Sequence, residues 1–189
     1  MMNSWLALIA STVIGGMVLL WFNGFRNDVQ QDSYMNLLED LSYNNLEDVT
    51  DVVEFDFARI GMGINDPRDV AVLNADSTDF TFKLDANNDG AFETIRYYLS
   101  DTSAASYTLN PRDRILYRVE NGGASEKLSS GLTSFRVTYY DQAGSVTADM
   151  SAMRSFGVRI TMENEIVYDN QTPMLSWESR ITPSALVMY

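Results

Sequence analysis

The chain has 189 residues, of which 46% are hydrophobic and 12% aromatic, enough apolar side chain for one folded domain of ordinary size. It contains neither cysteine nor histidine, which excludes disulfides, thiol nucleophiles, zinc sites built on those residues and the usual neutral-pH general base. The formal net charge of −13 would repel phosphate and argues against a nucleic-acid partner. We therefore expect a protein that is not an enzyme and does not bind nucleic acid.

The first 25 residues carry no charged side chain. The most apolar run, from Trp5 to Phe22, would be roughly 27 Å long as a helix, close to the roughly 30 Å of bilayer hydrocarbon. Trp5 and Trp21 lie near its ends, where aromatic rings prefer the membrane interface. This predicts a transmembrane helix over residues 1–26. A buried core helix and a cleaved signal peptide are alternatives, but no basic residue precedes the run and no small-x-small cleavage site follows it.

One face of this helix carries small residues. Ala7, Ser11 and Gly15 recur at four-residue spacing, with Thr12 and Gly16 displaced by one position. Small side chains in this pattern allow helix backbones to approach closely in lipid or in a lipid-like bundle. Transmembrane helices are often rich in glycine and alanine in any case. We interpret Ala7, Ser11 and Gly15 as a helix-packing face, with the N-terminus inside and the acidic domain exported.

Residues 27–62 are expected to form an amphipathic helical region. Apolar residues at Tyr34, Leu37 and Leu41 recur at helical spacing, and Asn44-Asn45 then predicts an interruption with Asn45 as the N-cap of a second helix. Arg59 and Gly61 provide the stop signals. The apolar stripe of the second helix is formed by Val49, Val52, Val53, Phe57 and Ile60.

Residues 63–189 change to alternating periodicity, which is typical of strands. Alternating runs cover residues 80–84, 95–99, 115–119, 135–139, 156–162 and, less regularly, 175–181. Turn-rich segments separate them, and such short connections imply antiparallel pairing. The predicted fold is α+β: a long N-terminal hydrophobic helix continues into an amphipathic helix and packs on an antiparallel sheet of about five or six strands. The predicted domains are residues 1–26, 27–62 and 63–189.

One loop has a pattern that suits a metal ion. Asp85, Asn87 and Asp89 alternate before Gly90, as in the first half of a calcium loop, with the Ala91 carbonyl as a backbone ligand and Glu93 at the ninth position. The twelfth position is Arg96 where a calcium hand has a bidentate glutamate. The segment predicts either a Ca²⁺ site closed by Glu93 in a β-hairpin or a hairpin turn that needs no metal.

Together these features resemble the type IV pilin and type II secretion pseudopilin superfamily, especially its larger minor subunits. The resemblance is carried by the apolar helix that runs into an amphipathic one, by the segment from Val53 to Gly63, and by the strand-loop-strand that holds Asp85 to Gly90 and Tyr97-Tyr98-Leu99. The sequence departs from the family at Gly15-Gly16, because Met17-Val18-Leu19-Leu20-Trp21 follows without the expected glutamate at the fifth mature position. The resemblance is therefore one of architecture rather than of prepilin peptidase processing.

The resemblance implies a structural subunit of a pilus, pseudopilus or related surface filament. Such a subunit is held in the bacterial inner membrane by its N-terminal helix before assembly and lies at the cell surface afterwards. Its partners are the membrane, copies of itself and related pilin-like subunits. The alternative is a monomeric, membrane-tethered, exported binding module of the cell envelope, which needs only the hydrophobicity of the helix.

Overall fold

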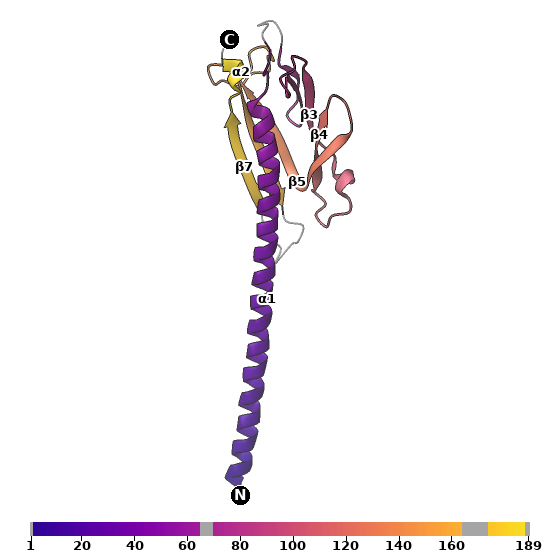
Figure 1. Ribbon diagram of the computed structural model, residues 1–189. Helices are drawn as coiled ribbons and strands as arrows, with labels where there is room; N and C mark the ends of the chain where they lie inside the picture. Colours follow the sequence, from indigo (N-terminus) through magenta and orange to yellow (C-terminus); the bar gives the residue numbers. More distant parts are fainter. Residues whose placement is uncertain (1, 65–69, 164–173, 188–189) are drawn as a thin grey trace. The chain divides into compact units, whose positions relative to one another are not determined.

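The computed structural model describes residues 2–64, 70–163 and 174–187 (Figure 1). A single helix, α1, runs from Met2 to Ala58 without interruption. The predicted break at Asn44-Asn45 is wrong. Each asparagine costs a helix at most about 0.7 kcal/mol relative to alanine, whereas burial of a side chain such as Leu46 or Val49 contributes about 1.5–3 kcal/mol. Since no proline or glycine lies between Gly24 and Gly61, nothing forces the helix to end.

The chain divides into two compact units, Met1–Leu41 and Ser42–Tyr189. In the first unit almost every described side chain is exposed. In the second unit one face of α1 is buried, from Leu46 onward. This division follows packing within the chain. The predicted divisions after residues 26 and 62 separate a membrane helix, an amphipathic helical region and a β domain, and they stay a prediction.

The second unit contains one antiparallel sheet in which every strand pairs with its neighbours in sequence. Its order is β1-β2-β3-β4-β5-β6-β7, and the sheet is curled (Figure 1). A 3-10 turn, η1 (Thr102–Ala105), lies between β3 and β4, and a short helix, α2 (Ser184–Val187), follows the last strand. The strands are β1 (Val72–Ala75), β2 (Asp79–Leu84), β3 (Glu93–Leu99), β4 (Arg114–Glu120), β5 (Ser125–Tyr140), β6 (Ser155–Glu163) and β7 (Met174–Ile181).

The α+β class and the antiparallel sheet are confirmed, and the sheet has seven strands where five or six were expected. The additional strand is β1, which is only four residues long and pairs with β2 in an irregular register between Val72 and Asn74. Such a short, irregular edge strand leaves no period-two pattern in the sequence. The predicted alternation is clearest in β2, where Phe80, Phe82 and Leu84 are buried.

The core lies between the second part of α1 and one face of the sheet. Phe57 is at its centre, with its ring centroid 5.2 Å from that of Phe80, 5.6 Å from that of Phe82 and 5.6 Å from that of Tyr97. The predicted stripe is buried except at Val52, which is half-buried, and its last residue, Ile60, lies in the turn just after α1. The hydrophobic stripe thus positions this part of the helix on the sheet.

Two glycines end the helix and lead the chain towards the sheet. Gly61 has a φ of +77° and its N–H donates to the Lys83 carbonyl at 3.0 Å. Gly63 has a φ of +83°, and a Cβ added there would lie 2.6 Å from the Asp85 Cβ. Gly61 was the predicted stop signal, and its left-handed backbone explains why glycine suits the position.

Candidate functional site

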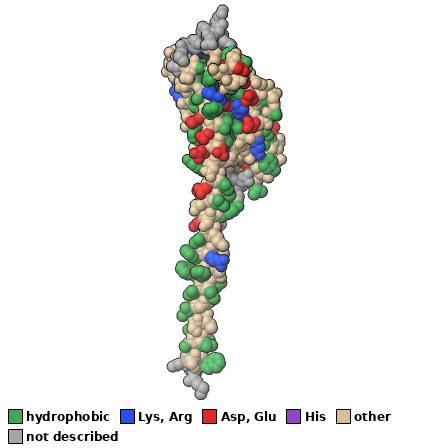
Figure 2. Space-filling view, in the orientation of Figure 1, with side chains coloured by type: hydrophobic (Ala, Val, Ile, Leu, Met, Phe, Trp, Pro, Cys, Tyr) green, Lys and Arg blue, Asp and Glu red, His purple; other side chains and the backbone are tan. Residues whose placement is uncertain are grey.

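The candidate site is the exposed apolar part of α1. The helix is long and apolar enough to cross a membrane, and its most apolar stretch has no residue buried within the described protein. Leu8, Val18 and Leu20 are 58%, 56% and 75% exposed. Figure 2 shows hydrophobic side chains, in green, along this N-terminal part of the helix. A helix that is apolar on all sides suits lipid or other helices better than water.

The hydroxyl groups in this stretch are satisfied by the helix itself. Ser11 Oγ donates to the Leu8 carbonyl at 2.9 Å, and Thr12 Oγ1 donates to the Ile9 carbonyl at 2.9 Å. A hydroxyl that bonds to its own helix backbone leaves no unmade hydrogen bond in a lipid environment. Ser11 and Thr12 are therefore compatible with a membrane.

The predicted packing residues Ala7, Ser11 and Gly15 are all exposed, and their four-residue spacing places them on one face of α1. A Cβ added to Gly15 or Gly16 would meet nothing within 4 Å. No described residue of the same chain therefore occupies the space beside these glycines. The packing of a second helix on this face stays a prediction.

The predicted calcium loop lies between β2 and β3, and its acidic side chains accept hydrogen bonds from the loop's own backbone. Asp85, which is 3% exposed, accepts from the N–H groups of Asp89 at 3.1 Å and Gly90 at 2.9 Å. Glu93 Oε2 accepts from the Ala86 N–H at 2.7 Å. The loop thus has the internal bonding of a turn rich in Asn, Asp and Gly.

Asn87 and Asp89 belong to the same internal network. Asn87 Nδ2 donates to Asp89 Oδ2 at 3.0 Å, and the Ala91 N–H donates to Asp89 Oδ1 at 2.8 Å. Within residues 2–64, 70–163 and 174–187, no group of three or more acidic, histidine or cysteine side chains is arranged to hold a metal ion. A Ca²⁺ ion at Asp85, Asn87, Asp89, Ala91 and Glu93 would have to compete with these hydrogen bonds, and the calcium site stays a prediction.

A buried charge cluster, not predicted from the sequence, joins α1 to the sheet. Asp56 is 2% exposed, and its Oδ2 accepts from Arg118 Nε at 2.7 Å and from the Tyr97 hydroxyl at 2.7 Å. Arg59 Nη2 donates to Asp56 Oδ1 at 2.9 Å. Arg118 also pairs with Glu120 at 3.1 Å. We name Asp56, Arg59, Tyr97 and Arg118 the Asp56 cluster.

The Asp56 cluster shifts the pKa of Tyr97 and that of Arg118. Burial and the nearby Asp56 charge raise the pKa of Tyr97 well above its usual range. Desolvation alone would lower the pKa of Arg118, but the hydrogen bond and charge of Asp56 outweigh it and raise that pKa. The buried Asp56 carboxylate accepts hydrogen bonds from Arg59, Tyr97 and Arg118, so the cluster is a structural link between helix and sheet.

One signal in the sequence could have indicated this cluster. Asp56 lies three residues after Val53 and one before Phe57, so it interrupts the buried stripe with an acid. A carboxylate at such a position needs a cationic or donor partner. Arg59 is within reach on the same helix, but Tyr97 and Arg118 lie far away in sequence, and no local pattern points to them.

No protein-family model, curated protein or solved structure matches this chain. Its pilin-like architecture therefore rests on its own features: an apolar N-terminal helix whose later part packs on an antiparallel sheet.

Proposed function

We propose that this protein is a pilin-like structural subunit of a surface filament. Its N-terminal helix would hold it in a membrane before assembly and pack against the helices of other subunits afterwards. The observation that carries the proposal is the exposed face of small residues on the uncharged N-terminal part of α1. Ala7, Ser11 and Gly15 are exposed, no side chain among the described residues lies against Gly15, and the Ser11 hydroxyl is already bonded.

The two parts of α1 support complementary roles. The uncharged part favours an apolar environment that the described protein does not itself provide. The later part fixes the helix to the sheet through Phe57 and the Asp56 cluster. A subunit that is pulled from lipid into a filament by its helix requires such a firm attachment between the helix and its exported domain.

The experiment compares filament assembly with membrane attachment. Ser11→Leu and Gly15→Leu place bulky groups on the packing face while keeping the helix apolar, so they should abolish filaments in sheared cell-surface material but leave the protein in the membrane fraction. The control is Val13→Leu, an apolar substitution on the face of α1 opposite Ala7, Ser11 and Gly15, which should leave both unchanged. Negative-stain microscopy with mass spectrometry of the fibres gives the readout.

Two other outcomes would replace the proposal. Unchanged filaments in Ser11→Leu and Gly15→Leu would reject the packing face, and the absence of this chain from any fibre would favour the membrane-tethered binding module. An intact mass that begins after the apolar helix would show that the segment is a cleaved signal sequence, which has the same length and apolar composition.

A further inference from the structure

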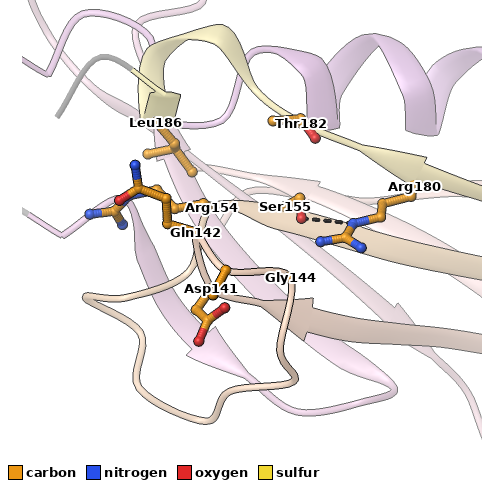
Figure 3. Close-up of a pocket in the computed structure, with 9 residues that line it drawn as sticks. Asp141, Gln142, Gly144, Arg154, Ser155, Arg180, Thr182 and Leu186 are labelled. Atoms are coloured by element: carbon orange, nitrogen blue, oxygen red, sulfur yellow. Dashed lines mark hydrogen bonds between the residues drawn. The ribbon is translucent and has the colours of Figure 1, made fainter.

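A surface pocket of about 340 Å³ lies where the β5–β6 connection, the end of β7 and α2 meet (Figure 3). Its walls include Asp141 and Arg154 from the connection, Arg180 from β7 and Leu186 from α2. In this view the guanidinium groups of Arg154 and Arg180 lie on opposite sides, with Asp141 between them. The volume is at the lower end of the range for small-molecule sites, about 300–1,000 Å³.

The guanidinium of Arg180 is held in place by neutral neighbours. Its carbon lies 4.0 Å from the centroid of the Tyr140 ring, and its Nε donates to Ser155 Oγ at 3.0 Å. A Cβ added to Gly144 would lie 3.5 Å from Arg180 Nη2. Because glycine has no Cβ, the space beside the Nη atoms of this guanidinium stays open. Within the part of the chain that the structure describes, Arg180 pairs with no carboxylate, in contrast to Arg159 on β6, which pairs with Glu178. A fixed guanidinium with open Nη donors is suited to bind two oxygens of one anion.

Arg154 adds a second cation and a buried donor. Its Nη1 donates to the carbonyls of Ser151 and Met153, both at 2.9 Å. Its Nε is buried and has no acceptor among the described residues. Buried donors normally have partners because an unmade bond is costly. Arg154 thus contributes positive charge to the pocket wall, while its Nε lies below the accessible surface.

The charges of the pocket select among anions. Arg154 and Arg180 contribute two positive charges and Asp141 one negative charge, so the walls carry one net positive charge in a chain of net charge −13. Asp141 Oδ1 accepts from the Ser145 N–H at 2.8 Å and stays at the pocket wall. A singly charged anion balances the net charge of the walls, whereas a dianion would leave one uncompensated negative charge beside Asp141. Leu186 gives the ligand an apolar wall for an aliphatic carbon.

We propose that this pocket binds a carboxylate group, which the Arg180 fork holds while Leu186 contacts the adjoining carbon. The carboxylate comes either from a small free carboxylic acid or from an aspartate or glutamate side chain of a peptide segment. The inference does not depend on the filament role, because every residue it uses lies in the second unit.

The test is a titration of the full chain in detergent micelles, followed by the ¹⁵N-¹H signals of the arginine Nε groups. Acetate and a short blocked peptide with one glutamate should shift the Arg180 and Arg154 signals saturably, while sulfate at equal ionic strength binds more weakly. Arg180→Gln should weaken acetate binding about tenfold, and Arg180→Lys should weaken it less because the charge remains but the fork is lost. Arg159→Gln, which removes a paired arginine outside the pocket, is the matched control and should bind as the wild type does.

Each remaining outcome has a defined meaning. Peptide binding at least about tenfold tighter than acetate identifies a peptide side chain as the source, and equal affinities identify a small free acid; both support the proposal. The proposal is wrong if no saturable shift occurs, if sulfate binds as tightly as acetate, or if Arg159→Gln loses as much affinity as Arg180→Gln. Backbone amide spectra of the variants, which should match the wild type, separate these results from unfolding.

Discussion

The two ends of helix α1 both carry apolar residues, but those of the N-terminal end are exposed and those of the C-terminal end include a face buried on the sheet. Residues 4–25 carry no charge, and all of their side chains are exposed. Residues 46–58 have acids such as Glu47, Asp51 and Glu54 on the exposed side and Val53 and Phe57 on the buried side. Where acids alternate with the apolar stripe, the helix finds its partner in its own sheet. Where no charge interrupts the apolar residues, no described part of the chain covers the helix.

The largest effect expected from this comparison is at Phe57. Phe57→Ala should lower the free energy of unfolding of the second unit by about 3–5 kcal/mol, because the truncation leaves a cavity among Phe80, Phe82 and Tyr97. Phe22→Ala, on the exposed end of the same helix, should change it by less than about 0.5 kcal/mol. Urea unfolding of the detergent-solubilised chain, monitored by near-ultraviolet circular dichroism, measures both. Equal effects would remove the distinction between the two ends.

The Asp56 cluster should rank next. Asp56→Ala should lower the free energy of unfolding by about 3 kcal/mol, near the lower end of the range for breaking a buried ion pair. The effect is at the lower end because Arg118 loses its partner in the core but keeps Glu120. Glu54→Ala, two residues away on the exposed side, should be close to neutral. The same unfolding assay applies. If Glu54→Ala were as harmful as Asp56→Ala, the acids of this helix would not divide into a structural and a solvated set.

A smaller effect should appear at alkaline pH. Burial raises the pKa of Tyr97 and of Tyr139, so the folded chain keeps protons that the unfolded chain releases above about pH 10. The stabilisation is complete below that pH and decreases as the pH rises, by up to about 1.4 kcal/mol per pH unit for each tyrosine. Tyr97→Phe should reduce the slope and Tyr97→Phe with Tyr139→Phe should reduce it further. An unchanged slope in unfolding curves between pH 9 and pH 11, a range chosen as roughly one unit on either side of the free tyrosine value, would contradict the assignment.

The smallest effect on folding is expected at Gly15. Gly15→Leu should leave the unfolding free energy of the second unit unchanged within about 0.5 kcal/mol, since no described side chain lies near the site. Any loss of assembly in that variant would then arise between chains. A marked destabilisation of the second unit would instead show that the exposed helix supports its own domain.

Much of the fold could be predicted from the sequence because its patterns are local. The alternation at Phe80, Phe82 and Leu84 reflects the two faces of one strand, and the stripe at Val49, Val53 and Phe57 reflects one face of a helix. The break at Asn44-Asn45 was a wrong prediction because propensity is weak where tertiary burial starts in the next turn.

The parts that the sequence did not reveal depend on contacts between distant residues. Asp56 meets Tyr97 and Arg118 only because β3 and β4 pair with each other beneath the helix. Arg180 approaches Ser155 only through the pairing of β7 with β6. The small-residue face of α1 was visible as a spacing, whereas these side-chain clusters require the register of the sheet.

The strictly sequential order of the sheet has a kinetic consequence. Each strand from β2 to β7 pairs with the strand made just before it, so the described sheet contains no pairing between strands distant in sequence. Folds with such local pairing close short loops and form faster than sheets with crossed connections of similar size. A chain that is synthesised from its N-terminus would be able to add strands one at a time as they emerge, before the last strand has been made.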